Sequence, residues 1–94
     1  MTTTTTMAAA LNAALRDCLG ASEDVVLIGE DIGTLGGVFR ITDGLKDSFG
    51  PARVIDSPLA ESGIIGTSVG MAYRGMRPVC EIQFAGFVYP GFDQ

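Results

Sequence analysis

Carboxylates are the side chains of this sequence best suited to acid–base chemistry. The 94 residues include no histidine, which removes the usual general base at neutral pH, a Ser-His-Asp triad within the chain and the commonest zinc ligand. Cys18 and Cys80 are too few for a disulfide framework or a metal cluster, and neither lies in a CxxC pair or beside a cation. We therefore expect two small buried cysteines, no metal site, and chemistry that depends on carboxylates or on a bound cofactor.

Three carboxylates follow short apolar runs of strand character. Glu30 and Asp31 come directly after the run 25–28, and Glu61 comes soon after the run 53–56. In open parallel sheets, ligands bind at the carboxyl ends of the strands. Two interpretations stay open for each position. Glu30 and Asp31 form either a solvated strand end or part of a ligand site, and Glu61 either complements a helix dipole or shares a proton with a heteroaromatic nitrogen.

Two glycine motifs resemble known sites but lack the right context. Residues 66–70 match GxSxG, the turn that exposes a nucleophilic serine in α/β-hydrolases, yet they fall inside a predicted helix. We expect Gly63, Gly66 and Gly70 instead to leave a groove for close packing, with this helix buried on several sides. Residues 33–37 lack the GxGxxG order, and no GK[ST] occurs, so we expect no phosphate cradle in the chain.

Apolar periodicity and turn residues predict alternating helices and strands. The predicted helices span 7–19, 42–49 and 58–74, and the predicted strands span 25–28, 53–56 and 78–83. We expect Thr42 and Ser57 to cap the later helices, and Gly20, Gly50 and Gly75 to end the three helices. The first helix would turn Asn12 and Arg16 away from the core. This order predicts an α/β fold: a parallel sheet with flanking helices.

Size and charge limit the possible partners. A 94-residue chain with 47% hydrophobic and 18% charged residues can form one domain with a small core. Eleven acidic against six basic side chains give a net charge of −5, which disfavours nucleic acid. No run approaches the roughly 20 apolar residues that cross a bilayer, and no targeting signal precedes the domain. We therefore expect no membrane association and a cytoplasmic protein.

The two ends of the sequence differ from the middle. Residues 1–6, with a threonine run at 2–6, are interpreted as a disordered leader, and residues 7–94 as the domain. Four of the seven aromatic residues, Phe84, Phe87, Tyr89 and Phe92, lie in the last eleven positions. Because such a surface normally packs against something, we expect further chain or a partner to cover it, and we interpret the polypeptide as truncated at its C-terminal end.

Six short motifs follow one another in a characteristic order. They are Gly29-Glu30-Asp31, GGVFR at 36–40, SPLAESGI at 57–64, RPV at 77–79, EIQF at 81–84 and YPGFDQ at 89–94. Together they resemble the β subunit of the E1 component of 2-oxo acid dehydrogenase complexes, from about Met7 to Gln94. The branched-chain type is most similar, with the pyruvate and acetoin enzymes close. The resemblance implies a partial thiamine diphosphate-binding, transketolase-like pyrimidine domain, of which residues 7–94 are the N-terminal part.

The resemblance also implies a reaction and its partners. Such β subunits hold the aminopyrimidine of thiamine diphosphate, while the E1 α subunit holds the diphosphate and Mg²⁺. Two α and two β chains assemble, so the partners would be an α subunit, a second β subunit and the E2 acyltransferase core. A small 2-oxo acid, branched-chain or pyruvate, would be decarboxylated, and the acyl group passed to lipoyl groups of E2 in the bacterial cytoplasm. A potassium-binding loop would lie beyond Gln94.

Motif by motif, the resemblance assigns roles to five residues. Glu61 corresponds to the catalytic carboxylate that hydrogen-bonds the pyrimidine nitrogen and favours its imino tautomer. Phe87 corresponds to the aromatic ring packed on the pyrimidine, Leu59 to an apolar wall and Gln83 to a polar contact at the ring edge. Glu30 resembles a member of an acidic passage between paired active sites. The sequence departs from the family pattern at position 91, a glycine where alanine is usual, and Phe87 stands where some branched-chain members have tyrosine.

Other functions remain open at this stage. The chain could be a non-catalytic interaction fragment that keeps the glycine-rich helix for subunit contact, or part of a transketolase-like synthase. If the chain is part of an E1 β subunit, the isolated fragment is expected to be inactive. The sequence leaves open which 2-oxo acid is used, what caused the truncation and whether the fragment folds alone.

Overall fold

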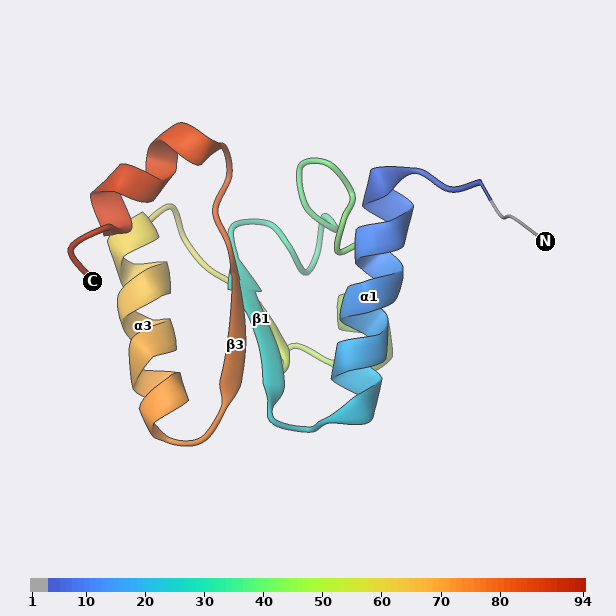
Figure 1. The fold of residues 1–94 in the computed structure, drawn as a ribbon, viewed down its shortest axis with the longest axis horizontal. Coiled ribbons are helices and arrows are strands. Elements are labelled where there is room, and N and C mark those ends of the chain that lie inside the picture. The colour runs from blue at the N-terminus through green and yellow to red at the C-terminus, as the bar shows by residue number, and fades with distance from the viewer. Residues whose placement is uncertain (1–3) are drawn as a thin grey trace.

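The computed structural model describes residues 4–94 and contains a parallel sheet between helices (Figure 1). In chain order the elements are α1 (Met7–Ala21), β1 (Val25–Gly29), α2 (Leu45–Phe49), β2 (Val54–Asp56), α3 (Glu61–Tyr73), β3 (Arg77–Glu81) and the 3-10 helix η1 (Ala85–Gly91). The strands pair in the order β2-β1-β3, and α1 and α3 lie on opposite sides of the sheet. The predicted α/β fold, a parallel sheet with flanking helices, is confirmed.

The central strand β1 aligns the carboxyl ends of all three strands. Gly29, its last residue, lies opposite Asp56 of β2 and Glu81 of β3. A Cβ atom at Gly29 would lie only 2.8 Å from the backbone oxygen of Glu81, so a glycine is needed for this close approach. The loop 30–44, the start of α3 and η1 gather at this same edge (Figure 1).

The hydrophobic core lies on both faces of β1, whose five residues are all buried, as the continuous apolar run predicts. On one face the cluster consists of Leu19, Val25, Leu27, Ile32, Leu45 and Val54. Because successive side chains of a strand alternate, Val26 and Ile28 point to the other face, the side of α3 and its buried Ile64.

Helix α1 begins at Met7, as predicted, and ends two residues beyond its predicted end. Thr6 caps its start, because the Thr6 hydroxyl oxygen accepts a hydrogen bond of 3.1 Å from the backbone N–H of Ala9. Thr6 therefore belongs to the fold, and the rest of the predicted leader falls partly on residues 1–3, outside the described residues. Gly20 does not end the helix, which runs on to Ala21. The backbone N–H of Ser22 closes it by donating to the carbonyl of Cys18.

The predicted caps of the two later helices are wrong. Thr42 donates its hydroxyl to the carbonyl of Ile32 at 2.7 Å, and α2 starts only after Gly44. Ser57 and the two residues after it stay outside α3, whose N-cap is Ala60. The predicted helix ends at Gly50 and Gly75 are confirmed: both glycines follow a helix with φ of +90° and +92°. The third strand ends at Glu81, two residues before its predicted end.

Two predictions about burial are also wrong. Cys18 is exposed, because the side of α1 that packs on the core carries Leu15 and Leu19, and Cys80 of β3 is only partly buried. In α3 only Ile64 and Ser68 are buried. Of the proposed glycine groove, Gly66 is approached by the side chain of Gln94, at 3.0 Å from a Cβ placed there.

Candidate functional site

Two carboxylates from different segments meet at the carboxyl edge of the sheet. Glu30 follows β1 directly, and Glu61 is the first residue of α3. Burial raises the pKa of the Glu30 carboxyl, and the negative charges of Glu61 and then Asp31 raise it further. Glu61 therefore lies close enough for its negative charge to act on the Glu30 carboxyl.

Backbone contacts explain why Glu61 lies at this edge. The N–H of Ser57 donates to the carbonyl of Gly29 at 2.8 Å, which holds the segment after β2 against the end of β1. Helix α3 then starts at Glu61, where the helix dipole favours a negative charge. Gly91 of η1 packs against the backbone of Glu61, since a Cβ at Gly91 would lie 3.1 Å from the Glu61 carbonyl oxygen.

The segment after β3 adds polar groups to the same edge. Gln83 donates its side-chain amide to the backbone carbonyl of Glu30 at 3.3 Å. Glu81, the last residue of β3, has a carboxyl whose pKa is raised by burial. It lines a cavity of about 110 Å³, together with Val38, Phe39, Ile41, Ile82, Gln83 and Phe84.

Aromatic rings continue this edge toward η1. Phe84 packs edge-on against Phe39, with ring centroids 6.2 Å apart, and against Phe87 at 6.3 Å. Phe87 lies in η1 and is half-exposed, and Leu59, two residues before Glu61, is 75% exposed. The structure thus brings Glu30, Glu61 and Gln83 together and sets Phe87 and Leu59 on adjoining segments.

Sequence reasoning missed Asp56 and Glu81. A usable signal was present: each of the three strands ends in, or is followed by, a carboxylate, namely Glu30, Asp56 and Glu81. The strand-end rule that selected Glu30 applies equally to the other two.

Ser68, the central residue of the GxSxG match, takes part in packing. It is buried in α3, donates its hydroxyl to the carbonyl of Ile64 at 2.8 Å and accepts the Cys80 thiol at 2.9 Å. A nucleophilic serine would instead stand exposed on a turn between strand and helix.

Residues 4–94 contain no group of three or more His, Cys, Asp or Glu side chains placed to hold a metal ion. None of the helices in this part of the chain is long and apolar enough to cross a membrane.

The fold agrees with a known domain family. Residues 3–94 match the transketolase pyrimidine binding domain, and the chain belongs to this family.

Its relatives include subunits of dehydrogenase complexes. The chain is 62% identical over 88 residues to the pyruvate dehydrogenase E1 component subunit beta of Leifsonia xyli subsp. xyli, covering 94% of the chain and 26% of the relative. It is 56% identical over 94 residues to the 3-methyl-2-oxobutanoate dehydrogenase subunit beta of Mycobacterium tuberculosis, covering 100% of the chain and 27% of the relative. It is 53% identical over 92 residues to the 2-oxoisovalerate dehydrogenase subunit beta of Pseudomonas aeruginosa, covering 98% of the chain and 26% of the relative.

These likenesses confirm the resemblance to E1 β subunits that the sequence motifs indicate. The chain spans about a quarter of the length of the curated relatives it matches.

Proposed function

We propose that this chain supplies the pyrimidine-binding surface of an E1 β subunit in a 2-oxo acid dehydrogenase complex. In this proposal residues 7–94 are the N-terminal part of the pyrimidine-binding domain. The observation that carries the proposal is the charge interaction of Glu61 with Glu30 at the carboxyl edge of a transketolase-type pyrimidine domain. Pyruvate and branched-chain enzymes both occur among the relatives, so the substrate class is a 2-oxo acid.

The residues at this edge have the chemistry needed to hold an aminopyrimidine. Burial and the negative charges of Glu61 and Asp31 raise the pKa of the Glu30 carboxyl, so this edge of the sheet favours a proton on Glu30. Glu61 would share a proton with a ring nitrogen of the aminopyrimidine. Gln83, whose amide is tied to the Glu30 backbone, would contact the ring edge.

Apolar groups would complete the binding of the ring. Phe87 is half-exposed and its ring is oriented by Phe84, which suits it to stack on a flat heteroaromatic ring. Leu59, on the segment that leads into Glu61, would form an apolar wall. When bound, thiamine diphosphate supplies the carbanion chemistry for decarboxylation, while these side chains bind it, orient it and hold its proton.

The proposal assigns the remaining parts to other chains. An E1 α subunit would hold the diphosphate and Mg²⁺, and a second β subunit would complete an α₂β₂ enzyme. The acyl group from a branched-chain 2-oxo acid or pyruvate would pass to lipoyl groups of an E2 core. We place this assembly in the bacterial cytoplasm, and we expect the isolated 94-residue chain to be inactive.

A chimeric subunit tests the role of Glu61. Residues 1–94 replace the matching part of the Leifsonia xyli relative, which is then co-produced with the α subunit of that organism. We expect Glu61→Ala and Glu61→Gln to lower 2-oxo acid decarboxylation at least about 100-fold, as loss of a positioned acid–base group does. Glu23→Gln, an exposed carboxylate at the opposite end of β1, is the control and should keep full activity. Near-normal turnover by the Glu61 variants would refute the proposal.

A non-catalytic role of the 94-residue chain is tested separately. The isolated chain is mixed with the same α subunit, and both complex formation and 2-oxo acid decarboxylation are measured. Binding without turnover is expected for a chain that acts only in a full-length subunit. Turnover by this mixture would contradict the inactivity that we assign to the isolated chain.

A further inference from the structure

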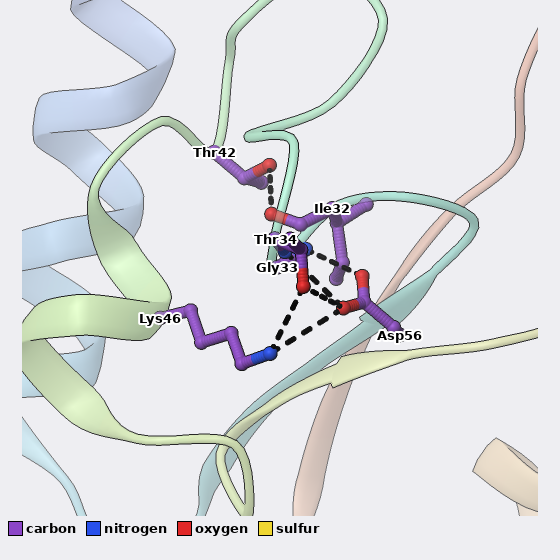
Figure 2. Close-up of polar contacts among 6 residues, drawn as sticks. All are labelled: Ile32, Gly33, Thr34, Thr42, Lys46 and Asp56. Atoms are coloured by element: carbon purple, nitrogen blue, oxygen red, sulfur yellow. Dashed lines mark hydrogen bonds and ion pairs between the residues drawn. The ribbon is translucent and has the colours of Figure 1, made fainter.

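Asp56 ends β2 and holds two loop residues and a lysine (Figure 2). Its Oδ1 accepts a hydrogen bond from the backbone N–H of Gly33 at 2.6 Å. Its Oδ2 accepts from both the backbone N–H and the hydroxyl of Thr34, each at 3.2 Å. Lys46 of α2 approaches the same oxygen at 3.7 Å and also donates to the Thr34 hydroxyl at 3.1 Å.

The charge state of Asp56 follows from these contacts. Burial opposes its ionisation, but the hydrogen bonds from Gly33 and Thr34 and the charge of Lys46 outweigh burial and lower the pKa of the Asp56 carboxyl. Asp56 is therefore a fixed anion near neutral pH. A charge-assisted contact of this kind holds a loop more firmly than a neutral one.

The loop that Asp56 holds carries one of the site carboxylates. Gly33 follows Glu30 by three residues, so the contact fixes the turn that leaves β1. A Cβ at Gly33 would lie 2.7 Å from Oδ2 of Asp56 and 2.9 Å from the Lys46 side chain, so the backbone approaches closely. Farther along the loop, the buried Thr42 donates to the carbonyl of Ile32, which braces the same turn (Figure 2).

The segment on the other side of Asp56 carries the second carboxylate. Residue 57, directly after Asp56, donates its N–H to the carbonyl of Gly29, and Glu61 follows four residues later. Asp56 thus lies between the two segments. Its side chain is hydrogen-bonded to the turn that follows Glu30, and its backbone continues directly into the segment that leads to Glu61.

We propose that Asp56 is a positioning residue that sets the separation of Glu30 and Glu61. This inference rests on the proposed function, because it concerns the protonation of that same pair. Without the carboxylate, the N–H groups of Gly33 and Thr34 lose their acceptor and the turn after β1 relaxes. The charges that act on Glu30 are Glu61 from α3 and Asp31 from its own loop. A longer distance from Glu61 weakens the larger of these two charge effects.

The test uses the chimeric enzyme with thiamine diphosphate and Mg²⁺ at saturation. Asp56→Asn keeps the size of the side chain but places a donor where Oδ1 or Oδ2 accepts. We expect kcat to fall about tenfold, as a modest misplacement of catalytic groups does, with KM for the 2-oxo acid little changed. The acidic limb of the pH profile should move to lower pH, because Glu30 feels less of the Glu61 charge. Asp17→Asn, an exposed carboxylate on α1, is the control.

Two more variants keep the inference falsifiable. If Asp56→Asn does not assemble, Thr34→Val removes one hydrogen bond to Oδ2 and should shift the pH profile in the same direction by less. Glu61→Gln is measured in parallel. Full activity of Glu61→Gln would refute the proposed function itself. A second outcome would overturn only the positioning role: Glu61→Gln is inactive, but Asp56→Asn or Thr34→Val leaves the pH profile unshifted. Loss of activity without that shift is a structural effect.

Discussion

At the scale of single residues, the ionised form of the Glu30 carboxyl lowers the stability of the folded chain. Its pKa is raised by burial and by the charges of Glu61 and Asp31, so the folded chain binds the Glu30 proton more tightly than the unfolded chain does. Stability therefore falls as the pH rises from the ordinary value of 4.5 through the raised one. Such a cost is common at functional sites, where charge is arranged for chemistry rather than for folding.

Glu30→Gln should remove this cost. We expect the variant to be more stable than the parent chain at pH 7, and the difference to disappear below about pH 4.5, where Glu30 is protonated in both states. Urea unfolding of the two chains at pH 4 and pH 7 measures the change. Glu23→Gln, at an exposed position, should show no such pH-dependent gain. A Glu30→Gln chain that loses stability at pH 7 would show that the carboxylate is favourably paired.

Ser68 leads to a prediction about packing rather than reactivity. Replacing Ser68 by alanine removes the hydrogen bonds to Ile64 and Cys80, so the free energy of unfolding should fall by about 1 kcal/mol. Urea unfolding measures the loss, with the exposed neighbour Thr67→Ala as control. A serine-directed fluorophosphonate should leave the chain unlabelled. Labelling at Ser68 would revive the nucleophile interpretation.

At the scale of the elements, helix ends depend on contacts that lie far away in the sequence. Apolar runs predicted the strands well, because burial of β1 on both faces demands an uninterrupted run. Thr42 has the side chain of a cap but donates its hydroxyl to the carbonyl of Ile32, and Ser57 is bound through its backbone N–H to Gly29, outside the helix. Rules based on neighbouring residues cannot predict these hydrogen-bond partners, because the partners are distant in the sequence.

Helix α1 shows the same limit on its polar side. The sequence turns Asn12 away from the core, yet its amide donates to the backbone carbonyls of Ile41 at 2.8 Å and Asp43 at 3.0 Å. This side of α1 therefore anchors the loop 30–44 rather than facing water. Periodicity identifies a polar face but does not reveal that a distant loop will cover it.

The candidate site was predictable to the extent that it follows strand ends. Glu30, Glu61 and Gln83 meet because parallel strands bring their carboxyl ends to one edge. Asp56 was missed because its partners, Gly33, Thr34 and Lys46, become neighbours only after β1 and β2 pair. A carboxylate at a strand end has the same local pattern whether it binds a ligand or a loop.

Gly20 offers a test of the corrected end of α1. It lies inside the helix with open space around its Cα, so Gly20→Ala should raise the free energy of unfolding by about 0.5 kcal/mol. Gly50, which follows α2 with φ of +90°, is the matched control, and Gly50→Ala should lower stability by about 1 kcal/mol. Thermal unfolding measures both. A destabilised Gly20→Ala chain would mean that the helix stops at Gly20 after all.

At the scale of the whole molecule, large apolar side chains remain at the surface near the end of the chain. Tyr89 is 80% and Phe92 81% exposed, and Phe84 and Phe87 are about half exposed. Large apolar side chains exposed in this number on one short segment usually contact another protein or another part of the same one. The relatives are about four times as long as this chain.

The isolated chain should therefore associate with itself. Sedimentation velocity should show a mass that increases with concentration, and more strongly at high salt, because salt screens the net charge of −5. Phe92→Asp should reduce the association. Thr67→Asp adds the same charge at an exposed polar position of α3 and should have a smaller effect. Equal effects of the two variants would assign the association to charge alone.

The lack of a side chain at Gly29 has a consequence for how the sheet can be assembled. If β1 slid by one residue against β3, either Ile28 or Glu30 would occupy the place where a Cβ comes within 2.8 Å of the Glu81 oxygen. Misaligned sheets are thus excluded by steric overlap. The same glycine lies opposite Asp56, so the register that Gly29 favours also places Asp56 and Glu81 at one edge of the sheet. A competent cofactor pocket would then be direct proof of a properly aligned sheet.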